Sequence, residues 1–122
     1  MKKILIVDDQ PEVKRLLEII LKGGGRQFFH ADSGEEAVAI ARSEKPDVIL
    51  LDVMMPGGMD GYETTKALKE DPLTAACPII TMTAKVQAQD QEDAFAAGAD
   101  DYIGKPFDIS DLKEKVDKFL TQ

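Results

Sequence analysis

The sequence predicts an α/β fold, built on a parallel β-sheet with helices on both of its faces. Five short apolar runs recur along the chain, and each is followed by a polar or helical stretch. The first, third and fourth runs are almost wholly apolar and partly β-branched, which is typical of strands buried on both faces. Alternation of such strands with helices indicates a parallel sheet. The length of 122 residues suits one core, so we expect a single domain spanning 1–122.

The expected strands are the apolar runs themselves. They read KILIV at 3–7, QFFHA at 27–31, DVILL at 47–51, PIITM at 78–82 and DYIG at 101–104. No linker, repeat or low-complexity tract separates them, which leaves nothing for a second domain.

The first helix is predicted from an apolar stripe that follows the first strand. The stripe recurs at i, i+3, i+4, i+7 and i+8, as one face of a helix requires, at Val13, Leu16, Leu17, Ile20 and Leu21. Pro11 suits the first turn of this helix, and the glycines at 23–25 end it.

Three later helices are predicted from their N-terminal caps. SGEE at 33–36 and DGYE at 60–63 are capping boxes with Ser33 and Asp60 as caps, and Asp108 caps the last helix. The remaining helix, at 85–97, has a weak apolar stripe and is closed by Gly98.

Charge and composition limit the partners of the chain. The formal net charge of −8 repels phosphate backbones and anionic lipid, so we expect no nucleic-acid binding. Cys77 is the only cysteine, which excludes an intrachain disulfide and fits a reducing compartment. The apolar run at 4–7 is too short for a signal peptide or membrane span. We expect a cytoplasmic protein without membrane insertion.

Residues capable of chemistry follow several of the expected strands. Asp8 and Asp9 follow the first strand, Asp52 the third, Thr83 the fourth and Lys105 the fifth. In an open parallel sheet, ligands bind beyond the carboxyl ends of the strands. Three carboxylates crowded there repel one another unless a cation lies among them, and Mg²⁺ prefers such oxygen ligands. A metal, a lysine and a hydroxyl around one carboxylate can receive a phosphoryl group, with Asp52 as the nucleophile.

Each of these residues alone has a simpler interpretation. Asp9 could cap the first helix, and Asp52 could be an ordinary turn residue. Thr83, Lys105 and Tyr102 are common residue types in strands and on surfaces. Their joint placement, rather than any one of them, carries the hypothesis.

Four motifs together resemble the receiver domain of two-component response regulators, of the stand-alone chemotaxis type. They are ILIVDDQ, DVILLDVMMPGGMDGYE, IITMTA and GADDYIGKPF, and they cover essentially the whole chain in order. The resemblance implies a doubly wound, flavodoxin-like fold with five parallel strands in the order 2-1-3-4-5 and five flanking helices. It also implies a signalling phosphoacceptor rather than an enzyme.

The resemblance further implies a phosphorylation site. Asp52 would accept a phosphoryl group from a histidine kinase or histidine phosphotransfer protein. Asp9 and Asp52 would bind Mg²⁺ through their side chains, Met54 through its backbone carbonyl, and Asp8 through a metal-bound water.

The same resemblance implies a switch that changes the binding of a downstream protein target. Thr83 and Lys105 would contact the phosphoryl group, and Tyr102 would turn inward as Thr83 moves. The bond before Pro106 would be cis. The conformational change would affect the face formed by residues 85–120.

One departure from the family pattern lies beside the expected site. The loop after Asp52 usually reads MPGMDG in the family but reads MPGGMDG here, with an extra glycine at Gly57–Gly58. The insertion follows Met54, so the expected metal ligands are retained.

Three other function classes share some of these features. A flavin carrier requires a phosphate-binding loop after the first strand, where this chain has DDQP. A phosphohydrolase with an aspartyl nucleophile usually has a D-x-D pattern there. A receiver that only binds proteins is disfavoured because all five site positions are filled.

Overall fold

The sheet has five parallel strands in the order β2-β1-β3-β4-β5. A computed structural model describes residues 1–55, 57–84 and 88–121 of the chain. The strands are β1 (Lys2–Val7), β2 (Arg26–Ala31), β3 (Val48–Asp52), β4 (Ile79–Thr83) and β5 (Asp101–Gly104). All neighbouring strands pair in parallel. The predicted fold class and strand order are therefore confirmed.

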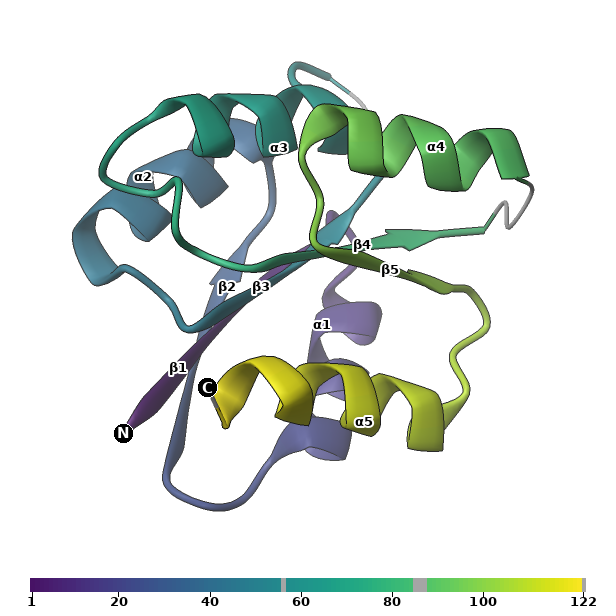
Figure 1. Cartoon of the computed structure of the whole chain (residues 1–122). Helices are drawn as coiled ribbons and strands as arrows, with labels where there is room; N and C mark the ends of the chain where they lie inside the picture. The colour runs from purple at the N-terminus through teal and green to yellow at the C-terminus, as the bar shows by residue number, and fades with distance from the viewer. Residues whose placement is uncertain (56, 85–87, 122) are drawn as a thin grey trace.

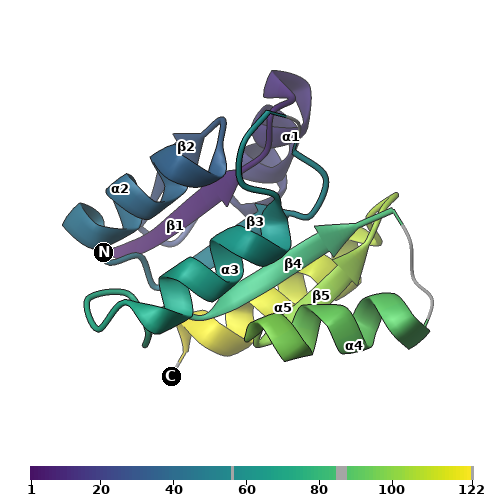
Figure 2. The ribbon, with the colours of Figure 1, turned by 90° about the horizontal axis from the view of Figure 1, so that it is seen from above.

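Five helices cover the two faces of this sheet. They are α1 (Pro11–Leu21), α2 (Gly34–Glu44), α3 (Gly61–Glu70), α4 (Ala88–Ala97) and α5 (Ile109–Leu120). Figures 1 and 2 show α1 and α5 on one face and α2, α3 and α4 on the other. The first three residues of the helix predicted at 85–97 lie outside the described residues.

Two apolar clusters fill the space between the sheet and its helices. One joins Ile4, Ile6 and Leu50 to the inner sides of α1 and α5. The other joins Leu5, Ile49 and Leu51 to α2 and α3. Alternate residues of a strand point to opposite faces, so β1 and β3 contribute to both clusters. Burying each such side chain contributes about 1.5–3 kcal/mol, which holds β3 rigidly in the centre of the sheet.

The three predicted cap residues each accept an N–H of their helix, but of the two predicted capping boxes only the one at Asp60 is complete in the described contacts. Ser33 Oγ accepts the Glu36 N–H at 3.1 Å, and Asp108 Oδ1 accepts the Asp111 N–H at 3.1 Å. Asp60 and Glu63 form a complete capping box at the start of α3. These side chains satisfy N–H groups that have no partner within the helix.

The prediction for the inner face of α1 is wrong at Leu16. Leu17 and Leu21 are fully buried, but the side chain of Leu16 is 49% exposed. The apolar stripe of α1 is wider than the surface that the sheet and α5 cover. Its outer edge at Leu16 therefore remains on the surface.

Candidate phosphoacceptor site

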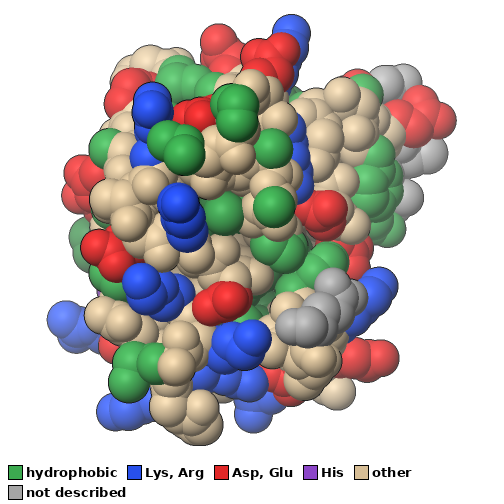
Figure 3. Space-filling view, turned by 60° about the vertical axis from the view of Figure 1, so that its left-hand side comes forward, with side chains coloured by type: hydrophobic (Ala, Val, Ile, Leu, Met, Phe, Trp, Pro, Cys, Tyr) green, Lys and Arg blue, Asp and Glu red, His purple; other side chains and the backbone are tan. Residues whose placement is uncertain are grey.

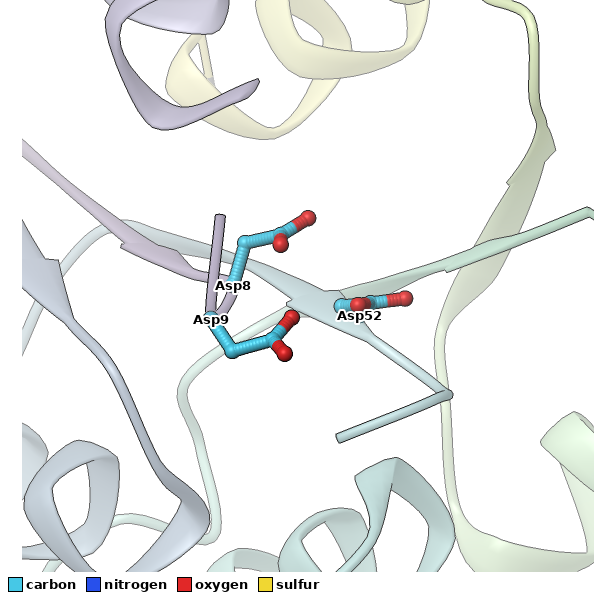
Figure 4. A group of neighbouring side chains, drawn as sticks. All are labelled: Asp8, Asp9 and Asp52. Carbon is cyan, nitrogen blue, oxygen red and sulfur yellow. The ribbon is translucent and has the colours of Figure 1, made fainter. Parts of the chain in front are cut away.

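The acidic residues of β1 and β3 converge at the carboxyl edge of the sheet. Asp52 is the last residue of β3, and Asp8 and Asp9 directly follow β1. These two strands are neighbours, with Val7 paired to Leu51. One carboxylate oxygen from each aspartate lies within 4.8 Å of the others. Figure 4 shows the three side chains together at this edge. The sequence-based prediction of an acidic group at this edge is confirmed.

The three carboxylates differ in their exposure. Asp8 is fully buried, Asp52 is 4% exposed, and Asp9 is exposed. Asp8 Oδ1 accepts the Gln10 N–H at 2.9 Å, which fixes its orientation. Gln10, rather than Asp9, is the N-cap residue of α1. The simpler interpretation of Asp9 as a helix cap therefore does not hold.

Lys105 partly balances the negative charge of this group. Its Nζ lies 3.3 Å from Asp8 Oδ2 and 3.3 Å from Asp52 Oδ1. The Lys105–Pro106 bond is cis. The Lys105 N–H donates to the Thr83 carbonyl at 2.8 Å, so β4 and β5 together place this lysine. Thr83 ends β4 and is buried.

The environment of Asp52 shifts the pKa of its carboxyl upward. Burial raises the pKa of its carboxyl above the ordinary value of 3.8, and the negative charge of Asp8 raises it further. The charge of Lys105 and the Met54 N–H oppose this rise in pKa without cancelling it. The ionised form of a buried and incompletely compensated carboxyl is stabilised when a further positive charge binds beside it.

The donor set fits a divalent cation. Three carboxylates that can each offer one oxygen within 4.8 Å form the hard, anionic ligand group that Mg²⁺ prefers. One lysine cannot neutralise three carboxylates, so a net negative charge remains for a cation to balance.

Two other expected residues do not join the acidic group. The Met54 N–H donates to Asp52 Oδ1 at 3.2 Å, while the Met54 side chain is exposed. Tyr102 lies in β5 opposite Thr81. Its ring packs edge-on against the Phe95 ring, with the two ring centroids 5.9 Å apart. Lys115 Nζ lies 4.7 Å from the centre of the same ring.

Two contacts at the carboxyl edge of the sheet were not predicted from the sequence. Lys14 of α1 is buried and pairs with Asp32 after β2. Gly61 approaches the end of β3 so closely that an added Cβ would lie 2.5 Å from the Asp52 carbonyl oxygen. The glycine in DGYE was visible as a helix start, but the sequence carries no signal of what packs against it.

Comparisons with known proteins agree with this geometry. Residues 4–117 match the model of the response regulator receiver domain. The chain belongs to this family. It is 41% identical over 120 residues to protein PilH of Pseudomonas aeruginosa, covering 98% of both chains. It is 39% identical to the phosphate regulon transcriptional regulatory protein PhoB of the same organism, but spans only 52% of that protein.

Solved structures give the same result. The chemotaxis response regulator CheY4 of Vibrio cholerae superposes with a TM-score of 0.89 at 30% identity, with 98% of each chain covered. As a receiver domain, the chain is a phosphorylation switch, a signalling phosphoacceptor rather than a classical enzyme. No helix within the described ranges is long and apolar enough to cross a membrane.

Proposed function

We propose that Asp52 accepts the phosphoryl group, from a histidine kinase or a histidine phosphotransfer protein. The observation that carries this proposal is the position of Asp52 at the end of the buried central strand, where the Lys105 ammonium contacts both Asp52 and Asp8. A rigid strand holds the carboxylate at the edge of the sheet, where a donor can reach it.

The transfer requires an in-line attack by a carboxylate oxygen of Asp52 on phosphorus. The oxygen–phosphorus bond forms as the phosphorus–nitrogen bond of the donor phosphohistidine breaks, and the imidazole leaves and takes up a proton. Asp52 Oδ1 is held by the Met54 N–H and Lys105, so we assign the attack to Oδ2. The Lys105 ammonium then pairs with a phosphoryl oxygen.

Asp8, Asp9, Asp52 and the Met54 carbonyl are the residues that would hold Mg²⁺. When bound, the ion screens negative charge between the carboxylates and the phosphoryl oxygens. Asp8 is already oriented by the Gln10 N–H and Lys105, which suits a carboxylate that acts through a metal-bound water.

The phosphodonor is proposed to dock beside α1. A groove between α1 and the segment after β5 contains Lys105 in its lining, together with apolar residues that include Leu16 and Ile109. Both apolar side chains are exposed. Because Lys105 also contacts Asp52, a helix in this groove would bring its phosphohistidine to the acceptor. Leu16→Glu should slow transfer from an autophosphorylated histidine kinase and leave the reaction with acetyl phosphate unchanged.

The output is proposed to pass through α4, β5 and α5 to a downstream protein target. Thr83 would move toward the phosphoryl group, and Tyr102 would respond from the neighbouring strand. The Phe95 ring and Lys115 that contact Tyr102 come from α4 and α5, so movement of this ring would alter both helices. Phosphorylation should therefore change amide hydrogen exchange in these three elements.

The partners that we propose are proteins in the cytoplasm. On the face in Figure 3, acidic side chains interrupt the Lys and Arg side chains. A mixed surface with a net charge of −8 is poorly suited to phosphate backbones, so no nucleic-acid contact through this domain is proposed.

The test is the intact mass of the protein after incubation with acetyl phosphate. We expect a gain of one phosphoryl group that requires Mg²⁺ and is absent in Asp52→Asn. No gain in the folded wild-type protein, or an equal gain in Asp52→Asn, would overturn the proposal.

A further inference from the structure

The segment between β3 and α3 links the acceptor Asp52, at the end of β3, to the start of α3. It begins directly after Asp52, where the Val53 N–H donates to the Met82 carbonyl and the Met54 N–H donates to Asp52 Oδ1. It ends at the Asp60 cap of α3. The Gly57–Gly58 pair lies between these two anchors. The end of the segment also returns to the acceptor, because the Gly61 N–H donates to the Val53 carbonyl at 3.0 Å, directly after Asp52.

The first turn of α2 holds this segment from the side. Glu35 Oε1 accepts the Met59 N–H at 3.0 Å, a contact between residues 24 positions apart in sequence. Gly58 has a φ of +126°, and a Cβ there would lie 2.8 Å from Glu35 Oε2. Glycine at position 58 thus permits both the backbone conformation and the close approach to the carboxylate.

Gly34 allows α2 to pack closely against the same segment. A Cβ on Gly34 would lie 2.1 Å from Thr64 Oγ1 and 2.9 Å from Met59 Cβ. The backbone of α2 therefore packs directly on Met59 and on the start of α3. This packing places the neighbouring Glu35 carboxylate beside the segment, although Glu35 itself lies at the surface.

We propose that Glu35 is a positioning residue for phosphoryl transfer at Asp52. By accepting the Met59 N–H, its carboxylate fixes the end of this segment and, through the contact between Gly61 and Val53, the backbone that directly follows Asp52. Glu35 does not touch the reacting atoms. The inference rests on the proposed function of Asp52.

The test compares Glu35→Ala, Glu35→Gln and the control Glu36→Ala. Glu36 carries the same charge in the same turn, and its described contact to Ser33 is through its backbone N–H. For each variant we would measure the phosphorylation rate with acetyl phosphate at fixed MgCl₂, the Mg²⁺ affinity from amide chemical shifts without a phosphodonor, and the exchange rate of the Met59 amide.

Glu35→Ala should weaken Mg²⁺ binding and slow phosphorylation by about fivefold, the scale of one lost hydrogen bond. Met59 amide exchange should accelerate in this variant. Glu35→Gln should restore all three properties because its side-chain oxygen still accepts the Met59 N–H. Glu36→Ala should match the wild type.

A second pair of variants alters the contact between Glu35 and Met59 from the side of the segment. Gly58→Ala should reproduce the effects of Glu35→Ala, and the double variant should be no worse than either single variant. Gly57→Ala controls for the positive φ alone, at +75° against +126° for Gly58, because a Cβ at position 57 would meet nothing within 4 Å.

Four results would overturn the inference. Wild-type rate and Mg²⁺ affinity in Glu35→Ala, despite faster Met59 exchange, would show that the contact has no role in the reaction. Unchanged Met59 exchange would show that the contact does not form. Failure of Glu35→Gln to restore function would make the charge, rather than the hydrogen bond, responsible. A wild-type protein that is not phosphorylated would instead refute the proposed function and the inference with it.

Discussion

Replacement of Lys105 by methionine should destabilise the metal-free protein through its acidic group. The substitution removes the ammonium that lies 3.3 Å from both Asp8 and Asp52 while keeping a side chain of similar length. At an effective dielectric constant of about 20, each of these pairs interacts by about 5 kcal/mol before desolvation is subtracted. Breaking a buried pair by removing one partner costs about 3–5 kcal/mol net.

The expected cost here is smaller, since solvent screens a side chain that is 24% exposed. We expect the free energy of unfolding to fall by about 2 kcal/mol, which for a domain of this size lowers the melting temperature by roughly 6–10 °C.

The assay is thermal unfolding followed by circular dichroism in buffer containing a chelator. Lys113→Met is the matched control, because Lys113 is an exposed lysine on α5 and its loss should change stability by less than about 0.5 kcal/mol. Combining Lys105→Met with Asp52→Asn should recover part of the loss, since one of the two uncompensated charges is then absent. Equal melting temperatures for Lys105→Met and the wild type would refute the electrostatic account of the site.

The remaining predictions concern the same edge of the sheet. Because burial raises the pKa of Asp52, the folded state binds the Asp52 proton more tightly than the unfolded state does. Protonation of Asp52 therefore stabilises the fold. This stabilisation is complete below pH 3.8 and is lost as the pH rises through the folded-state pKa. Asp52→Asn should therefore melt above the wild type at pH 7 without Mg²⁺, and the difference should vanish toward pH 4; a lower melting temperature at pH 7 would contradict this. MgCl₂ at ten times its dissociation constant should stabilise the wild type by about 1.4 kcal/mol, with no shift in Asp9→Asn; equal shifts in both would place the metal elsewhere. Gly61→Ala should cost about 1–3 kcal/mol because its Cβ meets the backbone of Asp52 and Val53 at 2.5 Å, and unchanged stability in urea would argue against this packing.

The sequence predicted the parts of the fold that depend on local pattern. The apolar run before Asp52 identified β3 because a strand buried on both faces requires such a run. Ser33, Asp60 and Asp108 located three helix starts because each cap bonds to a backbone N–H three residues away. The acidic edge was predictable since parallel strands bring their carboxyl ends together.

Other features depend on tertiary geometry that no local pattern encodes. The exposed edge of α1 at Leu16 follows from how much of the helix the sheet covers. Lys14 has the sequence character of a surface residue, yet it is buried and pairs with Asp32. The Glu35–Met59 contact joins two helix starts whose separation is set by glycine packing between α2 and α3.

The central claim is that Asp52 carries the phosphoryl group, and reductive trapping tests it most directly. Borohydride reduces an aspartyl phosphate to homoserine, which peptide sequencing by mass spectrometry locates in the chain. After treatment with acetyl phosphate and Mg²⁺, we predict homoserine at position 52, with Asp8 and Asp9 unmodified. Homoserine at position 8 or 9, or a phosphoryl group that survives reduction on another side chain, would contradict the account.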